Sequence, residues 1–179
     1  QYRAIFGFPV QDYYARAGFD FTRHSFDALA NSFMEDYIPA STSCPLMSGA
    51  QQALDAFAAA GLHQVILSAS PVSTLQRQVE EQGVARYFDR LLGLSDIYAK
   101  SKVALGLAYL RETGFDPRRA VMIGDSTHDF EVAQALGVHC VLQSGGHQPP
   151  EILQRTGAMV VPGLPEAADF ILRSVENDV

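Results

Sequence analysis

Two acidic residues, Asp125 and Asp129, follow an apolar run and stand four positions apart. The run is typical of a buried strand, and the residues after Asp125 favour a helix. Ligands of parallel α/β sheets bind at the carboxyl ends of strands, which predicts Asp125 at the mouth of a cleft. Residues four positions apart lie on the same face of a helix, so Asp129 is expected to point toward the same region as Asp125. Paired carboxylates are hard oxygen ligands that suit Mg²⁺. The alternative is that Asp125 and Ser126 only cap the helix while Asp129 faces solvent.

Hydroxyl and cationic side chains occur at two other junctions of the chain. Ser68 and Ala69 follow an apolar run and precede a predicted helix, where a hydroxyl and free N–H groups suit a phosphate oxygen. Lys102 stands at the start of the next long helix, where a cation opposes the helix dipole, and an anionic ligand would explain its place. The alternatives are serines that only cap the helix and a solvated lysine, with Lys100 as a competitor.

The elements that must position these residues alternate from Leu62 onward between short β-branched runs and longer helical stretches. That pattern predicts a Rossmann-like parallel α/β core with crossover helices. The predicted strands cover residues 64–68, 88–92, 120–124, 139–142 and 158–161. The predicted helices run from an N-cap at Ser70, with Pro71 at the first helical position, to about Gln82, and over 101–113, 126–136 and 164–173.

The first 44 residues have a different pattern, helical and without a strand. Apolar residues recur with a helical period, at Phe26, Leu29, Ala30, Phe33 and Tyr37, and Pro39 is predicted to end this helix. We therefore expect a small helical appendage over residues 1–44 and an α/β core over residues 45–179. The segment 41–44, just before Pro45, is the predicted hinge.

Composition narrows the classes of partner. The chain of 179 residues has a hydrophobic fraction of 47% and a net charge of −7, which predicts a globular chain of about one domain. This charge provides no broad positive field for nucleic acid or anionic lipid, so we expect neither as a partner, and an anionic substrate must be captured locally. The absence of a long apolar run and of a cysteine framework predicts a cytoplasmic protein.

The order of these features resembles the haloacid dehalogenase-like hydrolase superfamily, in particular its phosphoglycolate-phosphatase-like members with a helical cap. The resemblance extends over essentially the whole chain and implies that residues 1–44 are a small, incomplete cap. It implies that Ser68 binds the transferring phosphoryl group, with Ala69 beside it, and that Lys102 neutralises that group. It also implies that Asp125 binds Mg²⁺, and that Asp129 is either a second ligand of the metal or a residue that supports the ligands without contacting the metal.

The chain departs from that family at its start. Members open with an apolar strand ending in Asp-x-Asp, whose first carboxylate attacks phosphorus and whose second is a general acid and base. No Asp-x-Asp occurs in this sequence, and residues 4–10 place Gly7 and Pro9 where the carboxylates belong. We expect the first strand and helix to lie upstream of Gln1, which leaves two strands with unpaired edges. We predict that residues 2–8 fill this slot as a strand, in their own chain or swapped into a second copy.

Other groups could substitute for the absent nucleophile. His128, Asp12, Asp20 and a metal-bound water are the candidates, and the alternative for each side chain is an ordinary solvated position. Separately, His147 follows the strand 139–142 in a Gly-rich turn that could approach a ligand closely, and the alternative is a plain turn. Aromatic residues at 6, 8, 13, 14 and 19 could line a substrate pocket or pack a small helical layer.

These inferences lead to two readings of function. The first is an Mg²⁺-dependent phosphomonoesterase acting on a small organic phosphate such as phosphoglycolate or phosphoserine, without the usual Asp nucleophile. The second is a non-catalytic domain that keeps the phosphate and metal pocket. The partner in both is a small phosphorylated metabolite, and a homo-oligomer or strand-swapped dimer is the expected assembly.

Overall fold

Two parallel sheets form the centre of the protein. The computed structural model describes residues 2–94 and 101–177. In the first sheet β1 (Val65–Pro71) pairs with β2 (Arg90–Leu94), with Leu67 opposite Leu92. In the second sheet β3 (Val121–Gly124), β4 (His139–Gln143) and β5 (Met159–Val161) lie in that order, with Ile123 opposite Val141. All pairs are parallel, which confirms the Rossmann-like α/β prediction.

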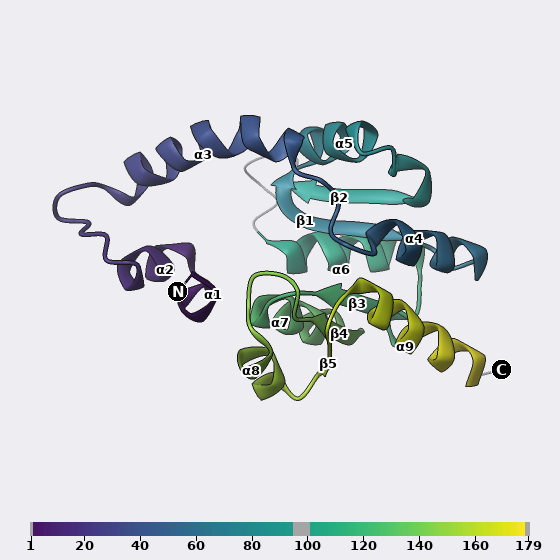
Figure 1. Cartoon of the computed structure of the whole chain (residues 1–179). Helices are drawn as coiled ribbons and strands as arrows, with labels where there is room; N and C mark the ends of the chain where they lie inside the picture. The colour runs from purple at the N-terminus through teal and green to yellow at the C-terminus, as the bar shows by residue number, and fades with distance from the viewer. Residues whose placement is uncertain (1, 95–100, 178–179) are drawn as a thin grey trace.

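Helices connect the strands and enclose the core. Helices α5 (Val72–Glu81), α6 (Lys102–Thr113) and α7 (Thr127–Leu136) are the crossovers, with the short α8 (Pro150–Leu153) after β4. Helix α6 contacts β1, β2 and α7, while α7 contacts β3 and β4, so α6 and α7 join the two sheets (Figure 1). Helices α4 (Ala50–Ala59) and α9 (Leu164–Asn177) pack on each other and bury Phe57, Val141 and Ile171.

The first three helices extend to one side of the sheets (Figure 1). They are α1 (Tyr2–Ile5), α2 (Val10–Arg16) and α3 (Phe26–Ser43). The prediction that Pro39 ends the last of them is wrong, because α3 continues through it to Ser43. A proline inside a helix removes one backbone hydrogen bond and its ring crowds the carbonyl four residues earlier, but on an exposed helix that carbonyl can tilt outward and bond to water. The division at residues 44 and 45 stays a prediction.

Most predicted boundaries agree with the structure to within two residues. At Ser70 the predicted type of structure is wrong as well as the boundary. Ser70 was predicted as an N-cap, with Pro71 as the first residue of the helix. Both residues belong to β1, and α5 begins at Val72 with Pro71 as its N-cap. A shift of register between Leu67 and Pro71 lets the strand run on to pair with Leu94, so tertiary pairing overrides the local capping signal. Strand β2 begins at Arg90 rather than at 88 because Ala85–Tyr87 forms a 3₁₀ turn before it.

The predicted strand over residues 2–8 is wrong. Residues 2–5 form α1, with the Phe6 N–H donating to the Tyr2 carbonyl at 3.0 Å. A helical turn brings Tyr2 and Phe6 together on one face, where both rings meet His147, whereas a strand would hold these two residues about 13 Å apart. Within the described residues no strand lies between β1 and β3, so each of these two strands has an unpaired edge. No helix in the described ranges has the length and apolar character needed to cross a bilayer.

Candidate active site

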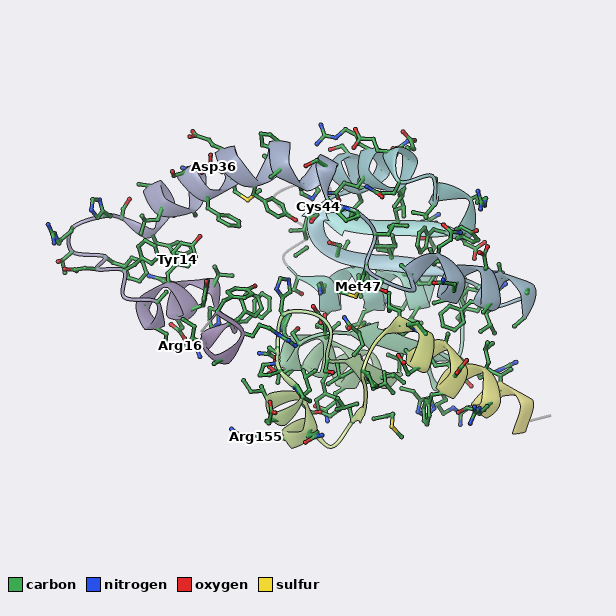
Figure 2. All side chains as sticks on the ribbon, in the orientation of Figure 1. Tyr14, Arg16, Asp36, Cys44, Met47 and Arg155 are labelled. Carbon is green, nitrogen blue, oxygen red and sulfur yellow. The ribbon has the colours of Figure 1, made fainter. Side chains whose placement is uncertain are left out.

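A cleft of about 320 Å³ opens between the two sheets. Leu67 of β1 and Ile123 of β3 both line it, so it lies along the unpaired edges of these strands. Met47, which Figure 2 labels, lines it from the segment before α4. Its remaining lining residues are Lys102, Gly124, Asp125, Asp129, Gln143 and Leu164. Three of the five predicted site residues are therefore brought together at the carboxyl end of β3.

Asp129 is the most enclosed carboxylate of the site. It lies in the first turn of α7 with 11% of its side chain exposed. Its Oδ1 accepts from Lys102 Nζ at 2.8 Å, and its Oδ2 accepts from Ser126 Oγ at 2.7 Å and from the Asp125 N–H at 3.2 Å. Burial raises the pKa of Asp129, but the Lys102 ammonium and these hydrogen bonds outweigh it, so the pKa lies below its ordinary value.

The ion pair with Asp129 explains why a cation, Lys102, lies at the start of α6. Ser101 caps α6 by accepting from the Ala104 N–H at 3.2 Å, which leaves Lys102 in the first helical position. The helix dipole disfavours a cation there, and the Asp129 carboxylate compensates for it. Only 20% of the Lys102 side chain is exposed, so its ammonium is held at the cleft by this ion pair.

Asp125 is held by the loop that follows β4. Its Oδ2 accepts from the His147 N–H at 2.8 Å, and its carbonyl accepts from the Gln148 N–H at 3.4 Å. Two glycines make this approach feasible, because a Cβ at Gly146 would collide with the Asp125 carboxylate and one at Gly124 would collide with Asp129. The glycines thus let two backbone segments close around the acidic pair.

Ser68 and Ala69 lie just beyond the cleft-lining part of β1. The Ser68 Oγ accepts from the Ser70 N–H at 3.1 Å, and Ala69 is exposed. Leu67, the residue before them, is the one that lines the cleft. The assigned roles of Ser68 and Ala69 in binding phosphate stay predictions.

The candidate replacements for a nucleophile lie outside the cleft lining. His128 pairs with Glu131 at 3.3 Å and is covered by the Phe8 ring at 4.7 Å. Asp12 lies in α2, and Asp20 accepts from the N–H and the hydroxyl of Thr22 in its own loop. His147 contributes its backbone N–H to Asp125, while its ring is covered by Phe6 at 4.5 Å. The predicted aromatic set therefore packs partly on the two histidines beside Asp125.

The Asp125 and Asp129 carboxylates could hold Mg²⁺ only together with water or phosphate oxygens as further ligands. Both oxygens of Asp129 already accept hydrogen bonds, so binding a cation through Asp129 would compete with Lys102. Asp125 has one oxygen engaged by His147 and lines the cleft. Among residues 2–94 and 101–177 no group of three His, Cys, Asp or Glu side chains could hold a metal. Mg²⁺ keeps several waters and takes phosphate oxygens, so one carboxylate is compatible with such a site.

Sequence reasoning missed two glutamines that build this end of the sheet. Gln143 is 4% exposed, lines the cleft and accepts from the Gly145 N–H at 2.8 Å. Gln148 is 3% exposed and accepts from the Thr127 N–H at 2.7 Å. The signal available in the sequence was their place, directly after the strand 139–142 and around a Gly-Gly turn, because that turn lies at the carboxyl edge of the sheet.

Comparison with known proteins identifies the family. The family model described as haloacid dehalogenase-like hydrolase matches residues 1–143. The chain belongs to the haloacid dehalogenase-like hydrolases. This haloacid dehalogenase-like chain is similar to a tyrosine-protein kinase PtkA of Mycobacterium tuberculosis, at 31% identity over 106 residues, 57% of this chain and 35% of that protein. It is also similar to a probable phosphoglycolate phosphatase of Pseudomonas putida, at 24% identity over 134 residues, 74% of this chain and 53% of that protein.

Solved structures share the fold. A predicted phosphatase from Clostridium acetobutylicum matches with a TM-score of 0.76 at 22% identity, covering 91% of this chain and 76% of that one. A putative phosphoglycolate phosphatase from Lactobacillus delbrueckii matches with a TM-score of 0.74 at 19% identity, covering 95% and 81%. The haloacid dehalogenase-like chain thus spans only 35% and 53% of the two sequence relatives named above.

Proposed function

We propose that this chain carries the phosphate-binding half of an Mg²⁺-dependent phosphomonoesterase that acts on a small organic phosphate. The observation that carries the proposal is the convergence of Lys102, Asp125 and Asp129 at one end of a cleft between two parallel sheets. The similarity to a probable phosphoglycolate phosphatase supports it, and phosphoglycolate and phosphoserine are the substrates to test.

Each residue has a separate role in this proposal. Lys102 binds the phosphate oxygens, and its ion pair with Asp129 holds the lysine side chain at the cleft. Asp125 would hold the magnesium ion, which supplies neutralisation of phosphate charge when it is bound. The Ser68 hydroxyl, in β1 next to the cleft-lining Leu67, would donate a hydrogen bond to the same phosphate. The net charge of −7 makes this local capture necessary, since the chain as a whole offers no broad positive field for an anionic substrate.

We further propose that an additional extended segment completes the site between β1 and β3. Both strands are parallel within their own sheets, each has an edge that no strand of residues 2–94 or 101–177 pairs with, and apolar side chains of both line the cleft between them. Free edges are templates for another strand. Such a strand is the natural carrier of the Asp-x-Asp carboxylates that the sequence lacks.

The test of the phosphatase proposal is phosphate release from phosphoglycolate, phosphoserine and an aryl phosphate, with Mg²⁺ and with a chelator. Asp125→Asn is the test variant, and Asp169→Asn, an exposed acid on α9, is the matched control. With a synthetic strand peptide that ends in Asp-x-Asp present, we expect chelator-sensitive release that Asp125→Asn abolishes and the control keeps. Release that survives Asp125→Asn would come from elsewhere and would contradict the assignment.

A non-catalytic binding domain is the second candidate, favoured by the absence of Asp-x-Asp from the sequence. A synthetic strand peptide that ends in Asp-x-Asp separates the two candidates. If the peptide binds and restores metal-dependent release, the chain is the incomplete half of a phosphatase. If the peptide and inorganic phosphate both bind without release from any substrate, the domain binds phosphate without turning it over.

A further inference from the structure

Gln148 lies where the N-terminal helices meet the Asp125 end of the sheet. Its side chain is buried, and both of its polar atoms are used, Nε2 donating to the Phe6 carbonyl at 3.2 Å and Oε1 accepting from the Thr127 N–H at 2.7 Å. Its backbone N–H donates to the Asp125 carbonyl at 3.4 Å. One amide side chain therefore joins a segment 142 residues away to the first turn of α7.

Arg3 and Tyr2 reinforce this connection from the same side. Arg3 Nη2 donates to the Gln148 carbonyl at 2.9 Å and also to the Ser144 carbonyl. The Tyr2 hydroxyl is 2.5 Å from His147 Nδ1, and the Phe6 ring stacks on the same imidazole. The loop from Ser144 to Gln148 is thus clamped against α1 by an arginine, two rings and a glutamine.

The clamped loop in turn holds Asp125. The His147 N–H donates to Asp125 Oδ2, and Gly146 lies against the carboxylate so closely that a Cβ would collide with it. A displacement of the loop would remove that donor and open the space beside the carboxylate. The orientation of Asp125 in the cleft therefore depends on contacts that originate in the first six residues.

We propose that Gln148 is a positioning residue that couples the docking of α1 to the orientation of the Asp125 carboxylate. The proposal rests on the proposed function of Asp125 as the site's metal-binding acid. Because a buried amide is costly unless hydrogen-bonded, undocking of α1 leaves the Gln148 Nε2 without its acceptor and loosens the loop. The N-terminal segment thereby controls the Asp125 end of the cleft without contributing a residue to its lining.

Two variants cut the coupling at different points. Gln148→Glu is close in shape and retains an oxygen for the Thr127 N–H, but it cannot donate to the Phe6 carbonyl. Arg3→Gln removes a surface guanidinium from the Gln148 and Ser144 carbonyls and leaves the buried residues in place. Arg16→Gln is the matched control, because Arg16 lies in α2 and its Nε donates to the Asp12 carbonyl of its own helix (Figure 2).

The readout is amide hydrogen exchange, measured residue by residue by NMR on the whole chain without metal. We expect the His147 and Gln148 amides to exchange at least tenfold faster in Gln148→Glu and Arg3→Gln, with the Val141 amide of β4 unchanged and Arg16→Gln like the parent. Unchanged exchange at His147 in both variants would overturn the coupling. Equal acceleration at Val141 would also overturn it, since that result assigns Gln148 a purely structural role.

Phosphate release is the second readout, and it distinguishes failure of the coupling from failure of the proposed function. Where the strand-complemented chain releases phosphate, Arg3→Gln should lower kcat more than it raises KM, because Lys102 still binds the substrate. If exchange responds as expected and no variant or parent releases phosphate, the coupling stands and the proposed function fails. If release is present and Arg3→Gln leaves kcat unchanged, the coupling has no role at Asp125 and the proposal is wrong.

Discussion

The ion pair between Lys102 and Asp129 offers the sharpest test of the site's energetics. Asp129→Asn removes the charge and replaces one acceptor oxygen by an NH₂ group, although three donors converge on the carboxylate. Breaking a buried pair by removing one partner costs about 3–5 kcal/mol, and since Lys102 retains some exposure we expect a loss of about 2–4 kcal/mol. The pair between Arg90 and Glu112 is the exposed control, for which Glu112→Gln should cost less than about 1 kcal/mol.

The assay is urea unfolding with a chelator present, so that no metal shifts the equilibrium. A double-mutant cycle with Lys102→Met should give a coupling free energy of about 1–3 kcal/mol between the two side chains. The pH dependence has a definite sign. The pKa of Asp129 is lower in the folded chain than its ordinary 3.8, so its stabilising contribution is complete above that value and is lost as the pH falls through the folded pKa.

The difference in stability between the parent and Asp129→Asn should therefore be constant between about pH 5 and pH 7 and shrink below about pH 4. A cost for Asp129→Asn no larger than that for Glu112→Gln would refute the buried pair. A difference that grew on acidification would refute the direction of the pKa shift.

Three further predictions concern single positions. Gly124→Ala should destabilise the chain by about 1–3 kcal/mol in thermal unfolding, since its Cβ would collide with Asp129, and an unchanged transition would contradict this packing. Cys140 should resist alkylation near neutral pH while the exposed Cys44 reacts, because burial raises the Cys140 pKa to about 11. Equal labelling of the two cysteines, measured by mass spectrometry, would be inconsistent with a buried Cys140. Leu142→Ala should cost about 2–5 kcal/mol because Leu142 is fully buried, whereas Val121→Ala at an exposed strand position should cost much less, and similar costs would argue against the core as described.

The α/β core was predictable because its signals are local and agree with its packing. The apolar pair Val141 and Leu142 fills buried positions of β4, and Gly114 and Gly137 end α6 and α7 in the left-handed conformation that favours glycine. Where sequence reasoning failed, tertiary contacts decided the outcome. Residues 2–5 have the composition of a strand but form a helix whose rings pack on His147, and Ser70 continues a strand because β2 pairs beyond it.

The site was predictable in part for the same reason. Asp125, Asp129 and Lys102 follow from their places at strand and helix ends, where parallel topology brings such residues together. The sequence indicated the ion pair between Lys102 and Asp129 only indirectly, because it placed a cation at a helix start, where the helix dipole disfavours it. The place of Gln148 near the end of a predicted strand could be seen in the sequence, but its hydrogen bond to the Phe6 carbonyl could not, because the two residues are 142 positions apart.

The most direct test of the central claim is metal-dependent phosphate release by the chain with a strand peptide ending in Asp-x-Asp, compared with the chain alone. With the peptide we expect release that requires Mg²⁺, that Asp125→Asn and Lys102→Met abolish, and that Asp169→Asn keeps. A peptide that binds between β1 and β3 without any release, or release that persists in Asp125→Asn, would contradict it.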